Sequence, residues 1–154
     1  MALTSLHGLY FEEFGVGDVA VSPTRTITET DIVMFAGLSG DYNEIHTSET
    51  YASTQHFGRR IAHGLLGLSV ASGLAFQMGF LIGTVDVFRS LEWEFTAPIF
   101  AGDTIRVEAE VVETKAFPRL RNGRVVFKVA VKNQRDDVVQ RGTWSLLVKQ
   151  KPAG

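Results

Sequence analysis

A polar stretch near residue 41 holds the side chains best suited to acid–base chemistry. Asp41, Asn43 and His46 lie within six residues of one another. A carboxylate and an imidazole held close together can exchange protons with a substrate or a water molecule near neutral pH. Asn43 can hold a loop carbonyl or the Asp41 carboxylate through its amide without titrating. Because Gly-Asp-x-Asn is by itself a common turn sequence, the acid–base interpretation needs support from elsewhere in the chain.

That support comes from His63 and Gly64, at the start of a long apolar segment. The first N–H groups of a helix have no intrahelical acceptor and lie at the positive end of its dipole, so the Gly64 N–H suits an oxygen that gains negative charge. Glycine also lets a bulky substrate approach the backbone closely. For His63 two interpretations are open, orientation of the substrate or a hydrogen bond to loop backbone. Ser72 either supports the site or bonds back to the preceding helical turn.

A metal site is the alternative use of these histidines. His46, His56 and His63 together with Asp41 offer ligand atoms that zinc accepts. Their spacing is irregular, however, and a metal-free role accounts for the same residues. The chain has no cysteine, which excludes disulfides, thiolate ligands and a cysteine nucleophile. We therefore expect no metal and no redox cofactor.

The charge distribution gives no indication of nucleic-acid binding. The chain of 154 residues is 45% hydrophobic and 21% charged with a net charge of -2, and its basic residues are scattered among acids. Arg59 and Arg60 are adjacent to the apolar segment. They are weak candidates for binding phosphate groups, since two arginines at such a position are also an ordinary soluble flank.

Two short helices are predicted on either side of the acid–base stretch. Thr28 and Asp31 form a capping box that opens a helix, which the glycines at 37 and 40 end. A polar loop follows and contains Asp41, Asn43 and His46. Thr47 or Ser48 can cap a second short helix that fades near residue 58.

The segment between Arg60 and Asp86 has 25 residues without a formal charge, enough to span a bilayer. Its five glycines and several polar residues lower its hydropathy, and neither flank carries a basic cluster. We expect a helix from Gly64 to about Phe80 that other structure wraps on every face. Residues 1–11 lack the basic start and apolar run of a signal peptide, so we expect a cytoplasmic protein without a membrane span.

The remainder of the chain alternates apolar and polar residues as amphipathic strands do. Short turns at 101–103 and 135–137 suggest that consecutive strands pair antiparallel. A single apolar helix in the concave face of such a sheet is an α+β hot-dog arrangement, and one domain over residues 1–154 accounts for the whole chain. The expected strands cover residues 91–96, 105–111, 125–131 and 138–148, with an earlier strand at about 19–27.

The residues from Leu38 to His46 (LSGDYNEIH) resemble the hydratase motif of the MaoC-like enoyl-CoA hydratase family, in which Gly-Asp-x-Asn-Pro-x-His is typical. Three further segments are similar to that family in the same order: FEEFGVGD at 11–18, IAHG at 61–64 and PIFAGD at 98–103. One departure is visible, since Glu44 stands where the family usually has proline. Proline would stiffen the loop, and glutamate adds a carboxylate there.

The resemblance implies a hydro-lyase that interconverts a 2-enoyl-CoA and the (R)-3-hydroxyacyl-CoA, with coenzyme A present only as part of the substrate. It implies that Asp41 and His46 form the acid–base pair within one subunit and that the Gly64 N–H binds the thioester oxygen. It also places Ser72 beside the catalytic water or carboxylate. Which of the two residues activates water depends on their coupled protonation, so we assign them jointly.

Two other functions stay open for a hot-dog domain. A thioesterase would commonly use a carboxylate on or near the helix and would not need the Asp-x-Asn-x-x-His sequence. A non-catalytic acyl-CoA-binding subunit is the third hypothesis, for which only Glu44 argues. Exposed sheet edges and a coenzyme A groove shared between neighbours predict a homodimer or a multiple of dimers.

Overall fold

The computed structural model describes residues 7–154. Residues 1–6, which belong to the N-terminal segment for which we expected no signal peptide, lie outside the described part. One antiparallel sheet dominates the chain, with the strand order β1-β4-β5-β6-β3 and β2 also paired to β4. The strands are β1 Val19–Val21, β2 Arg25–Thr26, β3 Val85–Phe95, β4 Thr104–Phe117, β5 Asn122–Lys132 and β6 Val138–Lys149.

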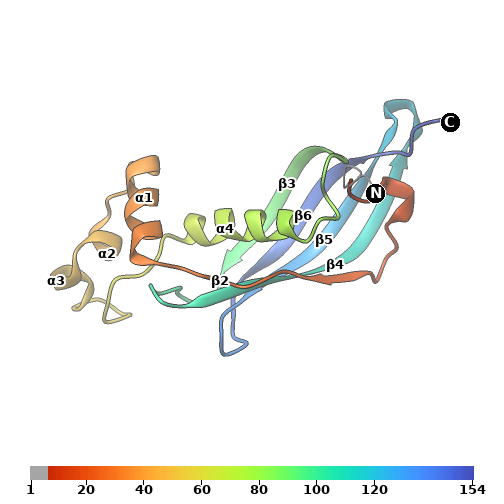
Figure 1. Cartoon of the computed structure of the whole chain (residues 1–154). Helices are drawn as coiled ribbons and strands as arrows, with labels where there is room; N and C mark the ends of the chain where they lie inside the picture. Colours follow the sequence, from red (N-terminus) through yellow and green to blue (C-terminus); the bar gives the residue numbers. More distant parts are fainter. Residues whose placement is uncertain (1–6) are drawn as a thin grey trace, which may run out of the picture.

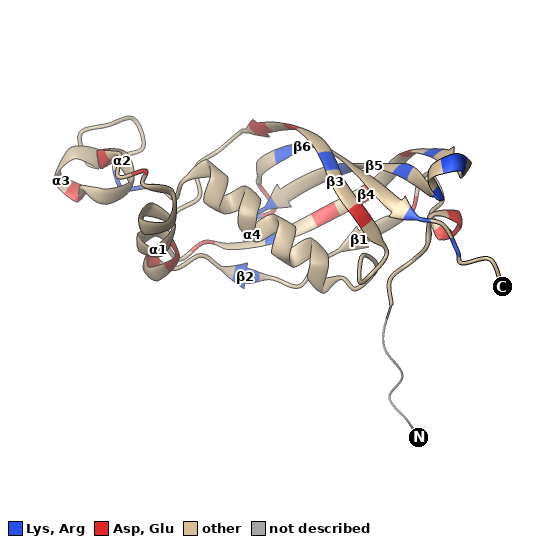
Figure 2. Cartoon of the chain, turned by 90° about the horizontal axis from the view of Figure 1, so that it is seen from above, with Lys and Arg blue, Asp and Glu red and all other residues tan. Residues whose placement is uncertain are grey.

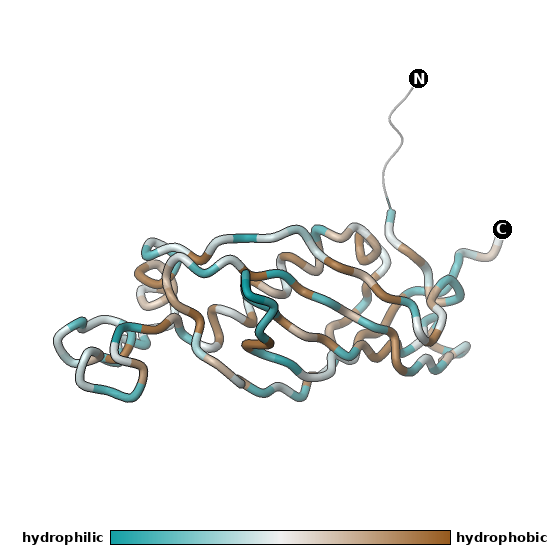
Figure 3. The backbone as a smooth tube through the Cα atoms, turned by 90° about the horizontal axis from the view of Figure 1, so that it is seen from below, coloured by the Kyte–Doolittle hydropathy of each residue, from teal (hydrophilic) through white to brown (hydrophobic). Residues whose placement is uncertain are grey.

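Helix α4 (Gly64–Gln77) lies in the concave face of this curved sheet (Figure 1). Its buried side chains, which include Leu66, Val70 and Leu74, pack in one apolar cluster with the inward residues of β4, β5 and β6. Figure 2 shows that α4 carries no charged residue, whereas charges line the strands. Along the strands, hydrophobic and hydrophilic residues alternate (Figure 3), as a sheet with one buried face requires. The predicted α+β hot-dog arrangement is confirmed.

Three short helices extend beyond one end of the sheet, near the start of α4 (Figure 1). Helix α1 (Glu29–Ser39) begins with the predicted capping box and ends at Gly40, whose φ of 76° is the left-handed conformation that favours glycine. Helix α3 (Glu49–Ala52) is capped by Ser48, as predicted. Between them lies α2 (Glu44–Thr47). His46 is therefore in a helix and not in the polar loop that we expected.

The strand pairing differs from the prediction at one place. β3 does not form a hairpin with β4 but pairs with β6, the last strand in the chain. The predicted turn at 101–103 is present, since Asp103 N donates to Phe100 O at 3.0 Å, but it does not join β3 and β4 as a hairpin. The N–H groups of Thr96 and Ala97 donate to Val139 O, Pro98 has no N–H, and Ile99 O accepts from Ala62 N at 2.7 Å. This connection crosses the start of α4 and delivers β4 to the opposite side of the sheet.

Two further expectations need correction. The early strand is broken into β1 and β2, with Pro23 between them. Helix α4 stops at Gln77 and is not wrapped on every face, because Leu65 is 59% and Phe76 57% exposed. Ser69, Ser72 and Gly73 share this open face. No helix within residues 7–154 is long and apolar enough to cross a membrane.

Candidate active site

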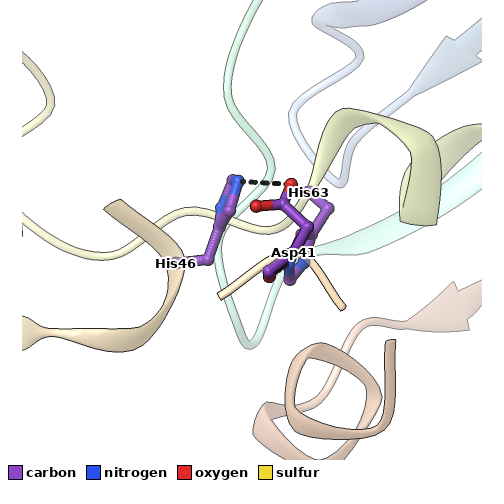
Figure 4. Close-up of side chains that lie close together, drawn as sticks. All are labelled: Asp41, His46 and His63. Atoms are coloured by element: carbon purple, nitrogen blue, oxygen red, sulfur yellow. Dashed lines mark hydrogen bonds and ion pairs between the residues drawn. The ribbon is translucent and has the colours of Figure 1, made fainter. Parts of the chain in front are cut away.

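The end of α1 places Asp41 at the edge of the site. The Asp41 N–H donates to Ser39 Oγ at 3.1 Å, and one oxygen of its carboxylate accepts from Asn43 N at 3.1 Å. The second carboxylate oxygen, Oδ2, is directed toward His46 (Figure 4). The Asp41 side chain is 52% exposed, so water reaches the carboxylate.

The short helix α2 sets the position of His46. Asn43 is its N-cap and accepts from Ile45 N at 3.1 Å, so Asn43 holds the helix that carries His46. His46 Nδ1 lies 2.8 Å from Ile61 O. A carbonyl oxygen only accepts hydrogen bonds, which assigns the proton to Nδ1 and leaves a lone pair on Nε2 in the neutral ring. That lone pair is the one that faces Asp41.

The distance between the two side chains suits one small molecule between them. His46 Nε2 and Asp41 Oδ2 are 3.9 Å apart, too far for a direct hydrogen bond. A water oxygen at about 2.8 Å from each atom would complete a triangle with both partners. The geometry can therefore hold a water molecule in contact with both groups.

His63 positions both residues from the core side. It is 2% exposed, its Nε2 lies 2.9 Å from Asp41 O, and its ring stacks on His46 with centroids 3.9 Å apart. Of the two interpretations of His63, the structure supports the hydrogen bond to loop backbone. This contact joins two residues that lie 22 positions apart in the chain. His63 Nδ1 is buried without a partner in residues 7–154.

The three side chains Asp41, His46 and His63 have potential ligand atoms within 4.8 Å of one another. The lone pair of an imidazole nitrogen lies in the ring plane, and the two histidine rings stack with an interplanar angle of 26°. Their lone pairs therefore do not converge on a common point. The arrangement suits proton transfer better than tetrahedral metal binding.

A cavity of about 370 Å³ adjoins His46 and the start of α4. At Gly64 an added Cβ would lie 2.7 Å from the ring of Phe95, so only glycine fits beneath that ring. The wall is mostly apolar, which suits an acyl group. Its lining residues are His46, Phe57, Ile61, Ala62, Gly64, Leu65, Phe95, Thr96, Ala97, Pro98, Ile99 and Gln140.

Of the predicted residues, His46 and Gly64 line this cavity, whereas Asp41, Asn43, His63, Ser72, Arg59 and Arg60 do not. Ser72 is exposed and its hydroxyl donates to Ser69 O at 2.6 Å, in the preceding turn. Arg60 is bound by the carboxylates of Glu49 and Glu29, which raise its pKa further. The Arg59 guanidinium lies 3.7 Å from the ring centre of Phe100 and is exposed. Of the two arginines, Arg59 is thus the one without a carboxylate partner among the described residues.

The sequence interpretation missed Gln140, a buried polar residue in the cavity wall. The sequence feature that could have indicated Gln140 is a glutamine at an inward-facing position of an otherwise apolar strand. Its side chain contacts α4, which no local pattern could show.

These features define a hot-dog protein in which Asp41, His46 and His63 lie close together beside the start of the central helix. A family model described as the MaoC like domain matches residues 15–133. The chain belongs to this MaoC-like dehydratase family, as the motif resemblance predicted.

Several relatives are similar over most of their length. A 3-hydroxybutyryl-CoA dehydratase of Methylorubrum extorquens is 36% identical over 97% of this chain and 90% of its own. An (R)-specific enoyl-CoA hydratase of Rhodospirillum rubrum is 39% identical over 77% of this chain and 86% of its own. Among solved structures, an R-hydratase from Pseudomonas aeruginosa superposes with a TM-score of 0.78 at 33% identity, covering 94% of this chain and 88% of that one.

Proposed function

We propose that this chain hydrates a 2-enoyl-CoA thioester to the (R)-3-hydroxyacyl-CoA, or catalyses the reverse dehydration. Asp41 and His46 act jointly as the acid–base pair on one water molecule. The observation that carries the proposal is the 3.9 Å separation between His46 Nε2 and Asp41 Oδ2, with the imidazole lone pair facing the carboxylate. The names of the relatives support the substrate class, and that of the Rhodospirillum enzyme supports the (R) configuration.

In the hydration direction the Asp41–His46 pair removes one proton from the water molecule. At the same time the oxygen of that water forms a bond to C3 of the substrate. The electrons of the C2–C3 double bond move toward the thioester carbonyl, whose oxygen becomes enolate-like. A proton then returns from the pair to C2, so the site ends in its starting protonation state. One pair can perform both transfers because the proton that it takes from water is replaced when it returns a proton to C2.

The developing oxygen charge needs a fixed donor. Gly64 is the first residue of α4, so its N–H has no intrahelical acceptor. It lines the same cavity as His46. We assign the Gly64 N–H to the thioester oxygen and the apolar cavity wall to the acyl group. His63 and Asn43 position Asp41 and His46 through the contacts described above.

The test is loss of the conjugated thioester absorbance with crotonyl-CoA and longer enoyl-CoAs, followed by chiral analysis of the product. Asp41→Asn and His46→Ala should each lower kcat by about 100-fold or more, the usual contribution of a positioned acid or base. Asp136→Asn and His56→Ala are matched controls, since both residues are exposed and outside the cavity. Near-normal turnover in either site variant would rule out the mechanism.

Helix α4 itself contains no carboxylate, but Asp41 lies near its start, so a thioesterase must be distinguished by experiment. Release of free thiol from acyl-CoA, measured in the same reactions, would distinguish it from hydration. Binding of acyl-CoA with neither reaction would support the non-catalytic alternative.

We further propose a homodimer that covers the open edge of the sheet. β3 is an edge strand of 11 residues, and such an edge pairs readily with another strand. Phe88 and Leu91 on β3 are each 42% exposed, and the open face of α4 carries Leu65 and Phe76. A second copy placed along β3 would bury these groups together. Ser72 lies on this exposed face, and its hydroxyl bonds back to Ser69 O, so of its two interpretations the structure supports the bond to the preceding turn.

Sedimentation at micromolar concentration tests the dimer. The wild-type chain should sediment as a dimer or a multiple of it, and Phe76→Lys should shift the equilibrium toward the monomer, because it would bury a charge without a partner. Leu120→Lys is the control, since Leu120 is 66% exposed and lies in the hairpin turn between β4 and β5. A monomeric wild type would contradict the proposal.

We expect the reaction to need no metal or redox cofactor, with coenzyme A entering only as part of the substrate. Arg59 is the better candidate for the coenzyme A phosphates, since the charge of Arg60 is neutralised by two carboxylates. Arg59→Gln should raise KM with little change in kcat. Unchanged activity after dialysis against a chelator would agree with the expectation, and loss restored by zinc would refute it.

A further inference from the structure

Gln140 is a buried amide in a mostly apolar cavity. It belongs to β6, is 2% exposed, and is one of three lining residues with a polar side chain, together with His46 and Thr96. Burying an amide costs free energy unless its groups find partners. We therefore expect both polar groups of the Gln140 amide to form hydrogen bonds inside the fold.

Both ends of the Gln140 amide are bonded. Its Oε1 accepts from Trp93 Nε1 at 3.0 Å, and its Nε2 donates to Gly64 O at 2.9 Å. Trp93 belongs to β3 and Gly64 to α4, so one side chain links two strands of the sheet to the first turn of the helix. These elements lie side by side in Figure 1.

Two glycines make room for this contact. A Cβ at Gly67 would lie 2.3 Å from Gln140 Nε2, so a larger residue there would displace the amide from the helix. A Cβ at Gly142 would lie 2.8 Å from Trp93 Cε3 and 1.9 Å from Glu92 O, so glycine lets the indole lie on the neighbouring strand. The amide thus contacts the helix backbone directly, at its first turn.

We propose that Gln140 is a positioning residue that fixes the first turn of α4, and with it the Gly64 N–H, relative to the cavity. This inference rests on the proposed hydration reaction. A donor stabilises a developing oxyanion only when it is already at the correct place, and displacement by about 1 Å can cost about 100-fold in rate. An apolar side chain would fill the same space without holding the helix in a defined direction.

The test is the division between kcat and KM. Gln140→Met keeps the approximate volume but neither hydrogen bond, and should lower kcat by about 10- to 100-fold while KM changes by less than about three-fold. Gln140→Glu should lower kcat as well, since a carboxylate accepts from Trp93 but cannot donate to Gly64 O. Trp93→Phe should have a smaller effect, and none when Gln140 is already methionine, because Trp93 acts through Gln140.

A spectroscopic signature separates positioning from general damage. The carbonyl stretch of a bound, saturated acyl-CoA reports how strongly its oxygen is polarised. We expect the wild-type shift to persist in Asp41→Asn and to shrink in Gln140→Met. If Gln140→Met does not fold, Gly67→Ala offers a second way to move the amide and should give the same pattern.

Asn122→Leu is the matched control, because Asn122 is also a buried amide, 7% exposed, at the far end of β5. It should cost stability without changing kcat or the carbonyl shift. A kcat for Gln140→Met within about two-fold of an active wild type would overturn the inference and leave the proposed function standing. A wild type without hydratase activity would instead reject the proposed function itself.

Discussion

Replacing Glu44 by proline tests whether the departure from the family motif has any cost. Glu44 is the first residue of α2, and its N–H has no intrahelical acceptor. Proline is favoured at this helix position. The preceding Asn43 has φ -51° and ψ 133°, which is the extended conformation that a following proline requires. Nothing in the local backbone therefore opposes the substitution.

We expect the proline to stabilise the folded chain, because it reduces the number of conformations that the unfolded chain can adopt. Such a change at a compatible position adds about 0.4–1 kcal/mol to the free energy of unfolding. For a domain of this size that corresponds to a rise in Tm of roughly 1–4 °C. Glu44→Ala is the reference, because it removes the same carboxylate from the helix N-terminus and keeps the N–H. The effect of the proline is the difference in Tm between Glu44→Pro and Glu44→Ala.

Thermal unfolding at a fixed protein concentration measures the effect, since Tm of an oligomer depends on concentration. The hydratase assay should show kcat within about two-fold of wild type for both variants, because the contacts that hold Asp41 and His46 do not use the Glu44 side chain. A lower Tm for Glu44→Pro than for Glu44→Ala would refute the backbone argument. Loss of activity in both variants would show that the carboxylate takes part in the site.

Three further substitutions follow from the fold. Burial opposes ionisation of Asp31, but hydrogen bonds from Thr28, together with the charge and hydrogen bond of Arg25, outweigh it and hold the pKa of that carboxyl below its usual value. The Asp31 carboxylate therefore stabilises the folded chain at any pH above its pKa in the unfolded chain, about 3.9. This stabilisation is lost as the pH falls through the lower pKa of the folded chain. Asp31→Asn should accordingly lower Tm at pH 7 and lower it much less near pH 3. Gly142→Ala should unfold the chain or displace β3, because the new Cβ would meet Glu92 O at 1.9 Å; a normal circular dichroism spectrum and Tm would disprove this. Asn43→Ala should lower the free energy of unfolding by about 1 kcal/mol through loss of the α2 cap. It should also lower kcat, because α2 carries His46. A loss of stability with kcat unchanged would restrict Asn43 to a structural role.

Local signals in the sequence predicted the helices near the site. The Thr28–Asp31 capping box and the Ser48 cap act within one turn, so the residues involved are visible as a short pattern. The site could be predicted in part for the same reason, because Asp41 and His46 are five positions apart. Their geometry could not, since it depends on Ile61 O and His63 across the fold.

Pairing partners and contacts between layers were beyond local patterns. Alternation assigns the faces of a strand but not its neighbour, and β3 was wrongly paired with β4 for that reason. The helix was expected to be wrapped on all sides because hydropathy reports how apolar a segment is and not which of its faces the rest of the chain covers. Gln140 was missed because its two partners lie 47 and 76 positions away.

The pairing of β3 with β6 also determines when the site can form during synthesis. The cavity wall needs Phe95 from one strand and Gln140 from the other, so it cannot close until the last strand has left the ribosome. Helix α4 emerges some 60 residues before that strand. During this interval its apolar surface lacks most of the sheet that later covers it, and it is a target for chaperones or for aggregation. A shortened chain that ends before β6 should accordingly be insoluble, although every proposed catalytic residue is already present.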